Sequence, residues 1–338
     1  MSNYYGRPIL KQPIWGPAVA AYFFTGGLAG MSGALSFMAR VRGNRALAKS
    51  ALGTSVAGLG VSLPLLVLDL GKPERFLNML RVVKPTSPMS IGSWILSGFS
   101  AATGVAVASE VAGAVRPHGL MRPLDLMRPL GLVAQGASAL LGTGVATYTA
   151  VLVSDTAVPA WHEGRREMPF IFAGSASASA GGAAAILTPT ADAGPARRLA
   201  LGGALVEVAA SELMKRRLGP LARPYEEGPV KVLDQLSTGL TVGGAILLGT
   251  LGRKRPAAVL GGTLLLAGSL CKRFAIFRAG FESARQTTDV ATEGPMPRSS
   301  ALDQSLRVQP VSSRRPGTKD AATAETERVG QQATPEAT

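Results

Sequence analysis

The residues most able to do chemistry in this chain are hydroxyl and carboxyl groups inside long apolar runs. Tyr148, followed by Thr149, lies near the end of one run, and Tyr22 lies near the beginning of another. A phenol can donate a hydrogen bond to a carbonyl group, or it can serve as an anchor at a membrane interface. Glu207 interrupts a further run, where a carboxylate at membrane depth costs roughly 2.5 kcal/mol or more. Glu207 is therefore a proton-pathway residue, a neutral, hydrogen-bonded packing residue, or part of a helix that lies nearer the membrane surface.

A second group of polar residues lies in a proline-punctuated segment at 70–90, between two apolar runs. The segment is longer and more charged than a simple connection requires, and its apolar side chains could lie along an interface. It predicts a surface on which a partner docks, formed by Lys72, Glu74, Arg75, Arg81 and Lys84. Asp69, just before the segment, could relay protons. The alternative is a salt-bridged loop that organises the subunit interface.

The elements that must position these residues are membrane helices. Hydrophobic residues make up 46% of the chain and charged residues 17%, and the apolar residues gather in charge-free runs. A run of about 20 such residues spans the hydrocarbon core as a helix. The sequence therefore predicts an all-α, polytopic membrane protein, with an eight-transmembrane-helix bundle in a membrane domain at 1–283 and a disordered tail at 284–338. The expected helices are 17–39, 48–69, 91–114, 129–153, 169–188, 198–214, 233–252 and 257–279. A soluble protein with Ala-rich buried helices is disfavoured, because one soluble core does not contain so many separate charge-free runs.

Composition also excludes several classes of protein. The net charge of +14 arises before the tail and fits basic loops against lipid headgroups, so nucleic-acid binding is not expected. His118 and His162 fall in expected loops, so no bis-histidine haem is expected in the bundle. Cys271 is the sole cysteine, which excludes a cysteine-ligated cluster within the chain, and no metal site is expected. Lys272 is expected to end the last run and to reach toward the headgroups. The first helix itself should direct insertion, because the residues before it do not form a signal peptide.

Over about residues 1–285 the chain resembles the NrfD/PsrC family, the integral-membrane subunits of polysulfide-reductase-type respiratory complexes. The segments that carry the resemblance are Tyr4-Tyr5-Gly6-Arg7-Pro8, Tyr22–Gly30, Asp69–Trp94, Ala146–Trp161 and Arg273–Ser283. The first and third are the most specific.

The resemblance implies a subunit that is not catalytic alone and binds a quinone (menaquinone or ubiquinone) near the membrane surface. Electrons would pass between that quinone and a ferredoxin-like 4Fe-4S subunit docked on the 70–90 segment, with a molybdopterin catalytic subunit beyond, as in polysulfide reductase or formate dehydrogenase. Tyr148 matches a quinone ligand of polysulfide reductase, and Tyr22 and Thr149 are expected beside it. Val19 departs from the family pattern, since it cannot replace the asparagine found there. The resemblance also implies a location in the cell membrane, with both termini on the iron–sulfur side, expected to be extracytoplasmic.

Two other functions stay open at this level. A secondary transporter often has helices broken by Gly or Pro, as several of these runs are, although no internal repeat is evident. A structural anchor without a quinone site would show the same apolar pattern. The substrate of the partner subunit, the direction of electron flow and the membrane orientation are not encoded in any residue that we can name, since the lysines and arginines divide almost equally between the two sides.

Overall fold

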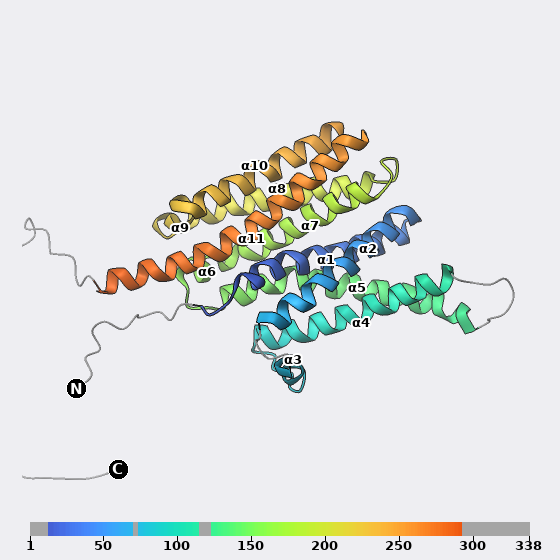
Figure 1. The fold of residues 1–338 in the computed structure, drawn as a ribbon, viewed down its shortest axis with the longest axis horizontal. Helices are drawn as coiled ribbons and strands as arrows, with labels where there is room; N and C mark the ends of the chain where they lie inside the picture. Colours follow the sequence, from blue (N-terminus) through green and yellow to red (C-terminus); the bar gives the residue numbers. More distant parts are fainter. Residues whose placement is uncertain (1–12, 70–73, 115–122, 293–338) are drawn as a thin grey trace, which may run out of the picture. The chain divides into compact units, whose positions relative to one another are not determined.

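The computed structural model describes residues 13–69, 74–114 and 123–292. Within these ranges every regular element is a helix (Figure 1). The long helices are α1 Pro17–Val41, α2 Arg45–Asp69, α4 Pro88–Ala114, α5 Pro123–Ser154, α7 Met168–Leu187, α8 Gly194–Leu218, α10 Gly228–Leu251 and α11 Arg255–Thr292. The short helices are α3 Glu74–Met79, α6 Pro159–Glu163 and α9 Arg223–Glu226.

Seven of the long helices in the described ranges are long and apolar enough to cross a membrane, which confirms the all-helical membrane class. The remaining one, α8, corresponds to the run predicted at 198–214. Its 25 residues extend over roughly 37 Å, but it contains Glu207 and Glu212 and three basic residues in its last turn. The count of eight spans therefore stays a prediction, although the eighth long helix itself is present.

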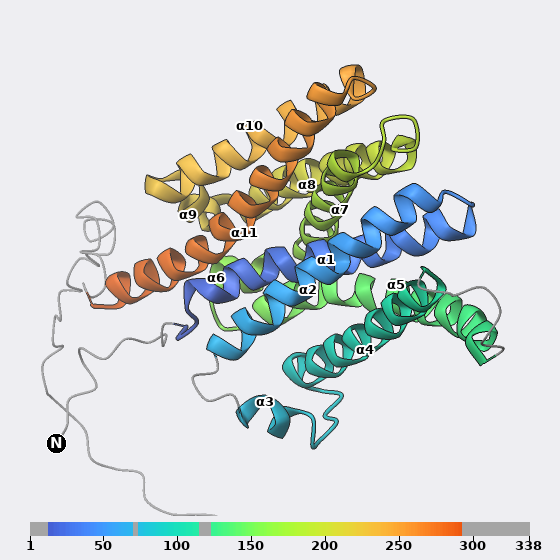
Figure 2. The same ribbon diagram turned by 45° about the vertical axis from the view of Figure 1, so that its right-hand side comes forward.

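The long helices form two groups that pack side by side. One group contains α1, α2, α4 and α5, and the other contains α7, α8, α10 and α11 (Figures 1 and 2). Within the groups the closest partners are consecutive antiparallel helices, as expected for short connections. Helix α7 also packs against α1, α2 and α5, and α11 packs against α1. Since α7 is rich in Ala, Gly and Ser and almost wholly buried, it joins the two groups, as its weak hydrophobicity predicts.

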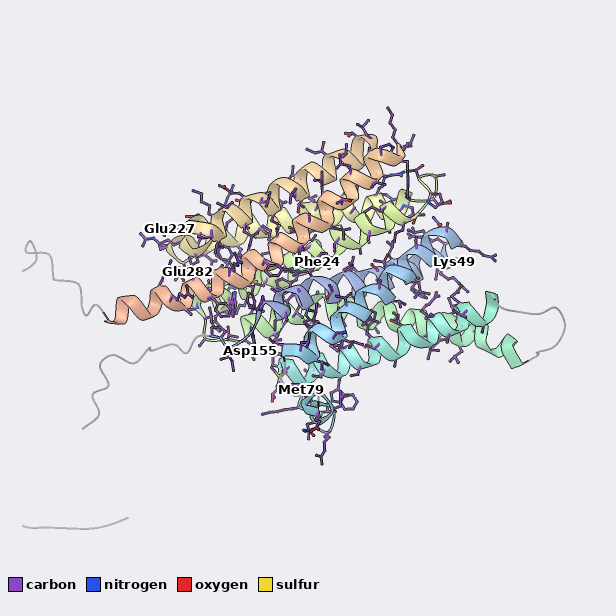
Figure 3. The ribbon with its side chains drawn as sticks, in the orientation of Figure 1. Phe24, Lys49, Met79, Asp155, Glu227 and Glu282 are labelled. Carbon is purple, nitrogen blue, oxygen red and sulfur yellow. The ribbon has the colours of Figure 1, made fainter. Side chains whose placement is uncertain are left out.

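The beginning of α1 and the C-terminal part of α11 lie at the same end of the bundle, which we call the entry end. Trp15 stacks on Trp161, with ring centroids 5.8 Å apart, and Trp161 also contacts Phe281 in α11. Figure 3 shows Glu227 and Glu282 toward this end and Lys49 at the other, the far end. The described residues form an even number of long antiparallel helices, so the last helix ends at the same end of the bundle at which the first begins.

The structure corrects two predicted details of α11. The helix ends at Thr292 rather than near residue 279, so residues 284–292, which were assigned to the tail, are helical. Lys272 does not reach a headgroup, because it lies inside the bundle with 2% of its surface exposed. The predicted disorder of the tail stays a prediction, since residues 293–338 lie outside the described residues.

Candidate functional site

Two tyrosines from different helices meet near the entry end. Tyr22 lies in the second turn of α1 and Tyr148 lies two turns before the end of α5, and their hydroxyl groups are hydrogen bonded to each other. Tyr22 is buried and Tyr148 is half-buried. One phenol donates to the other, so the hydrogen of the accepting phenol is left for a third group. We call these two residues the phenol pair.

Close helix packing brings the phenol pair together. Gly30 of α1 and Gly142 of α5 cross so closely that a Cβ atom on either would overlap the backbone of the other. Gly92 of α4 lies against the ring of Tyr148, and a Cβ atom there would overlap the ring. The positions of both phenols therefore depend on small residues at these contacts.

Two further predicted site residues are connected to the phenol pair in different ways, Thr149 as the neighbour of Tyr148 in sequence and Asp69 through the beginning of α1. Thr149 is buried, and its hydroxyl has no hydrogen-bond partner among the described residues. Asp69 accepts a hydrogen bond at 3.0 Å from the backbone N–H of Gly16, the residue that precedes α1. A carboxylate at this position also interacts favourably with the positive end of the α1 dipole. Asp69 therefore fixes the end of α2 to the beginning of α1, on which Tyr22 is carried.

A second constellation lies in the other helix group, around Glu207. This carboxyl group is fully buried in the middle of α8, and the Thr241 hydroxyl lies 3.4 Å from its Oε1 atom. Its Oε2 atom has no hydrogen-bond partner among the described residues, although Ser175 is close. The cations that act most strongly on it are Lys272 and Arg273 of α11, both buried.

A chain of ion pairs leads from Lys272 to the surface. Lys272 Nζ lies 2.7 Å from Asp234 Oδ1, and Lys215 Nζ lies 3.1 Å from Asp234 Oδ2. Lys215 is in turn paired with Glu212 at 2.6 Å. Asp234, Lys215 and Glu212 line a cavity of about 480 Å³ at the entry end. We call Glu207, Arg273, Lys272, Asp234, Lys215 and Glu212 the buried ion chain.

Tyr225 of α9 lines the same cavity. Burial raises the pKa of its hydroxyl well above the ordinary value, and the nearby Asp234 acts in the same direction. Its hydroxyl has no hydrogen-bond partner among the described residues. This phenol therefore stays protonated and can donate at the mouth of the ion chain.

Arg273 connects the two constellations. Its Nη2 donates to the backbone oxygen of Phe172 at 2.8 Å, and its guanidinium lies 3.7 Å from the centroid of the Phe172 ring. The Phe172 ring packs against Phe23, with centroids 5.9 Å apart, and Phe23 follows Tyr22 in α1. The Phe23 and Phe172 rings thus lie between Tyr22 of the phenol pair and Arg273 of the buried ion chain.

The family model described as polysulphide reductase, NrfD, matches residues 9–199, more than half of the chain. The chain belongs to the NrfD family. No curated protein has a sequence that matches it. Proteins of the NrfD family are membrane subunits of redox complexes, and this chain is accordingly a multi-pass membrane protein.

The part of the chain that matches NrfD contains the phenol pair, Thr149 and Asp69. It ends in the second turn of α8, so Glu207 and the rest of the buried ion chain lie beyond it. Sequence reasoning found Glu207 but not Asp234, Lys272 or Arg273 as members of one buried network. A signal was available for the last two, because apolar residues 274–277 continue the helix beyond the cations.

The predicted docking residues of this NrfD protein are described in part. Glu74, Arg81 and Lys84 are exposed, on and after α3. Lys72 lies outside the described residues, as does the side chain of Arg75. Val82 and Val83 are 67% and 61% exposed, so the segment presents apolar as well as charged side chains.

Proposed function

We propose that this chain is the quinone-binding membrane subunit of a respiratory oxidoreductase complex. Electrons would pass between the quinone pool and an iron–sulfur subunit docked on the 70–90 segment, with a molybdopterin catalytic subunit beyond. The observation that carries the proposal is the phenol pair, since it offers a spare O–H donor near one end of the bundle. Membership of the NrfD family supports it, because such proteins belong to redox complexes.

The residues around the phenol pair fit a quinone headgroup. A quinone has two carbonyl oxygens that accept hydrogen bonds, and the pair supplies a donor for one of them. The unpartnered hydroxyl of Thr149, the residue after Tyr148, supplies a second donor. Buried donors without partners are uncommon in proteins, which makes them candidates for ligand contacts. The quinone supplies the redox chemistry, and these residues bind and orient it.

We also propose that protons reach this region through the buried ion chain, with Glu207 as its innermost carboxyl group. The chain begins at a cavity on the entry end and ends at Arg273, which the Phe172 and Phe23 rings separate from the phenol pair. Unpartnered polar atoms on Glu207 and Arg273 are sites at which water molecules could complete a path. Asp69 keeps the proposed role in proton transfer, but its contact with Gly16 gives it a positioning role as well.

The proposal is tested on the assembled complex, purified in a mild detergent. Replacing Tyr148 or Tyr22 with Phe removes the spare donor and should raise the quinone KM about threefold to tenfold, the usual effect of one lost hydrogen bond. Thr149→Val should act in the same direction, whereas Thr147→Val, two residues earlier and bonded to the backbone of its own helix, should not. Electron transfer to a soluble dye should stay unchanged in all four variants.

Three results would contradict the proposal. If neither tyrosine substitution changes quinone-linked turnover, the chain is a structural anchor without a quinone site at this position. Parallel loss of dye-linked and quinone-linked activity would indicate misassembly rather than a ligand contact. A chain that purifies without any redox partner and moves a solute across vesicles would indicate a secondary transporter.

A further inference from the structure

An apolar groove lies at the far end of the bundle, between α1 and α8. It encloses about 440 Å³, within the range of small-molecule sites. Met31, Ala34, Leu35 and Met38 form its α1 wall, and their spacing places them on one helix face over about 10 Å. Pro195 and Leu199 form the α8 wall.

Two arginines stand at the mouth of this groove. Arg42 follows the end of α1, one turn beyond Met38, and Arg198 lies in the first turns of α8. Both are exposed, and neither has an ion pair or a side-chain hydrogen bond to any described residue.

Three other arginines at the same end have partners within the protein. Arg40 is paired with Glu110, and Arg197 donates to the backbone oxygens of Thr190 and Gly252. Arg255 donates to the backbone oxygen of Thr188. The protein itself thus satisfies three arginines at this end, whereas the side chains of Arg42 and Arg198, like those of the exposed Arg45 and Arg253, have no partner among the described residues. Arg42 and Arg198 are the two that line the groove, where a ligand can reach both.

The mouth is also held in place by hydrogen bonds. The Asn44 side chain donates to the backbone oxygen of Asp192 at 2.8 Å, which joins the loop after α1 to the loop before α8. Its Oδ1 atom accepts from the backbone N–H of Leu47 at 3.0 Å and so caps α2. Arg42, just after α1, and Arg198, near the beginning of α8, are therefore next to two loops that are joined to each other, so the spacing of the mouth is largely set before a ligand arrives.

We propose that this groove binds one anionic phospholipid, with an acyl chain along the α1 face and the phosphate between Arg42 and Arg198. The positive charge of the two arginines at the mouth favours an anionic lipid over a neutral quinone as the ligand of the groove. A phosphate group accepts hydrogen bonds from two guanidinium groups and neutralises them, as basic pockets between membrane helices do for acidic lipids. A quinone headgroup is neutral and requires no such pair. The two methionines provide an adaptable wall for a flexible hydrocarbon chain.

The test is native mass spectrometry of the full chain in mild detergent with added palmitoyl-oleoyl phosphatidylglycerol. Arg42→Gln/Arg198→Gln should lower the retained phosphatidylglycerol by roughly tenfold or more, since each arginine near an anionic surface contributes appreciably. The matched control is Arg253→Gln/Lys254→Gln, which removes the same charge from exposed residues at the same end and should stay within twofold of the wild type. Ala34→Trp, which fills the groove and keeps both arginines, should also abolish retention.

Several results would overturn the proposal. Unchanged retention in the arginine double variant or in Ala34→Trp would exclude this groove. Equal loss in the control variant would show that only net charge matters. Phosphatidylcholine or menaquinone bound as tightly as phosphatidylglycerol, with the same response to substitution, would assign the groove to another ligand. Since the groove and the phenol pair lie at opposite ends, each of these results leaves the quinone proposal standing.

Discussion

At the scale of the residue, charge balance explains why the buried ion chain can exist within the helix bundle. It contains three carboxyl groups, Glu207, Asp234 and Glu212, and three cations, Arg273, Lys272 and Lys215. Ion pairs join Lys272, Asp234, Lys215 and Glu212, and the positive charges of Lys272 and Arg273 act on Glu207. A buried ion without a partner strongly destabilises a protein, whereas a buried ion pair has little net effect on its stability. Such a network adds little to stability, so its presence in an apolar bundle favours a role in moving charge.

Glu207 is the residue at which that role can be tested. Glu207→Gln keeps the shape and the contact with Thr241 but removes the proton that the carboxyl group can exchange. We expect quinone-linked turnover of the assembled complex to fall about tenfold or more, as for loss of an acid–base group. Glu110→Gln is the control, because the Glu110 carboxylate forms an ion pair with Arg40 at the far end. Unchanged turnover in Glu207→Gln, with normal assembly, would remove Glu207 from the proton path.

Glu167 offers a test of pH dependence outside the membrane spans. Arg217 makes two hydrogen bonds to its carboxylate, at 2.7 and 2.6 Å, and holds the pKa of Glu167 below the ordinary value of 4.5. Protonation therefore favours the unfolded state. The stabilisation is complete above pH 4.5 and is lost as the pH falls through the lower pKa of the folded protein.

The corresponding measurement is thermal unfolding in detergent between pH 7 and pH 3. Arg217→Gln should be less stable than the wild type by about 1 kcal/mol near neutrality, since the pair is partly exposed. The difference should shrink below about pH 4.5. Arg216→Gln, at the exposed neighbouring position, should track the wild type throughout. A difference that is constant with pH would show that Arg217 acts by packing alone.

At the scale of the element, the α1–α5 crossing determines the geometry of the phenol pair. Gly30→Ala should destabilise the protein by about 1–3 kcal/mol, because the added Cβ overlaps the Gly142 backbone. Gly53→Ala in α2 is the matched control, since nothing lies within 4 Å of its Cβ position and alanine favours helix. Thermal unfolding should separate the two variants in opposite directions. Equal stabilities would show that α1 and α5 can move apart at no cost.

The sequence of this protein predicts which long helices exist, and it predicts less accurately where each helix ends. Charge-free runs predict the long helices because the bilayer requires continuous apolar surface. The same rule places Lys272 at the end of the last apolar run, whereas this cation lies inside the bundle. The rule fails there because Asp234, which neutralises Lys272, is supplied by another helix. The phenol pair was predicted residue by residue, but its direct contact depends on glycine contacts between helices that no single run of sequence specifies.

At the scale of the whole molecule, the chemistry is divided between the two helix groups and converges at the entry end. The first group contains the phenol pair and the described part of the 70–90 segment, and the second contains the buried ion chain. Arg273 and Phe172 lie where the groups meet. Under the proposed function, a quinone at the phenol pair would lie between the segment proposed to dock the partner and the ion chain proposed to carry protons.

The partner surface can be tested by charge reversal. Arg81 and Lys84 are exposed beside Val82 and Val83, a combination of apolar and basic side chains that suits a protein contact. Arg81→Glu/Lys84→Glu should lower the iron–sulfur subunit recovered with the affinity-tagged chain by about fivefold or more, with stronger loss at low salt because charge repulsion is then unscreened. Arg253→Glu/Lys254→Glu makes the same change at the far end and should leave recovery unchanged. If both variants keep the partner, or both lose it, the iron–sulfur subunit does not dock on this segment.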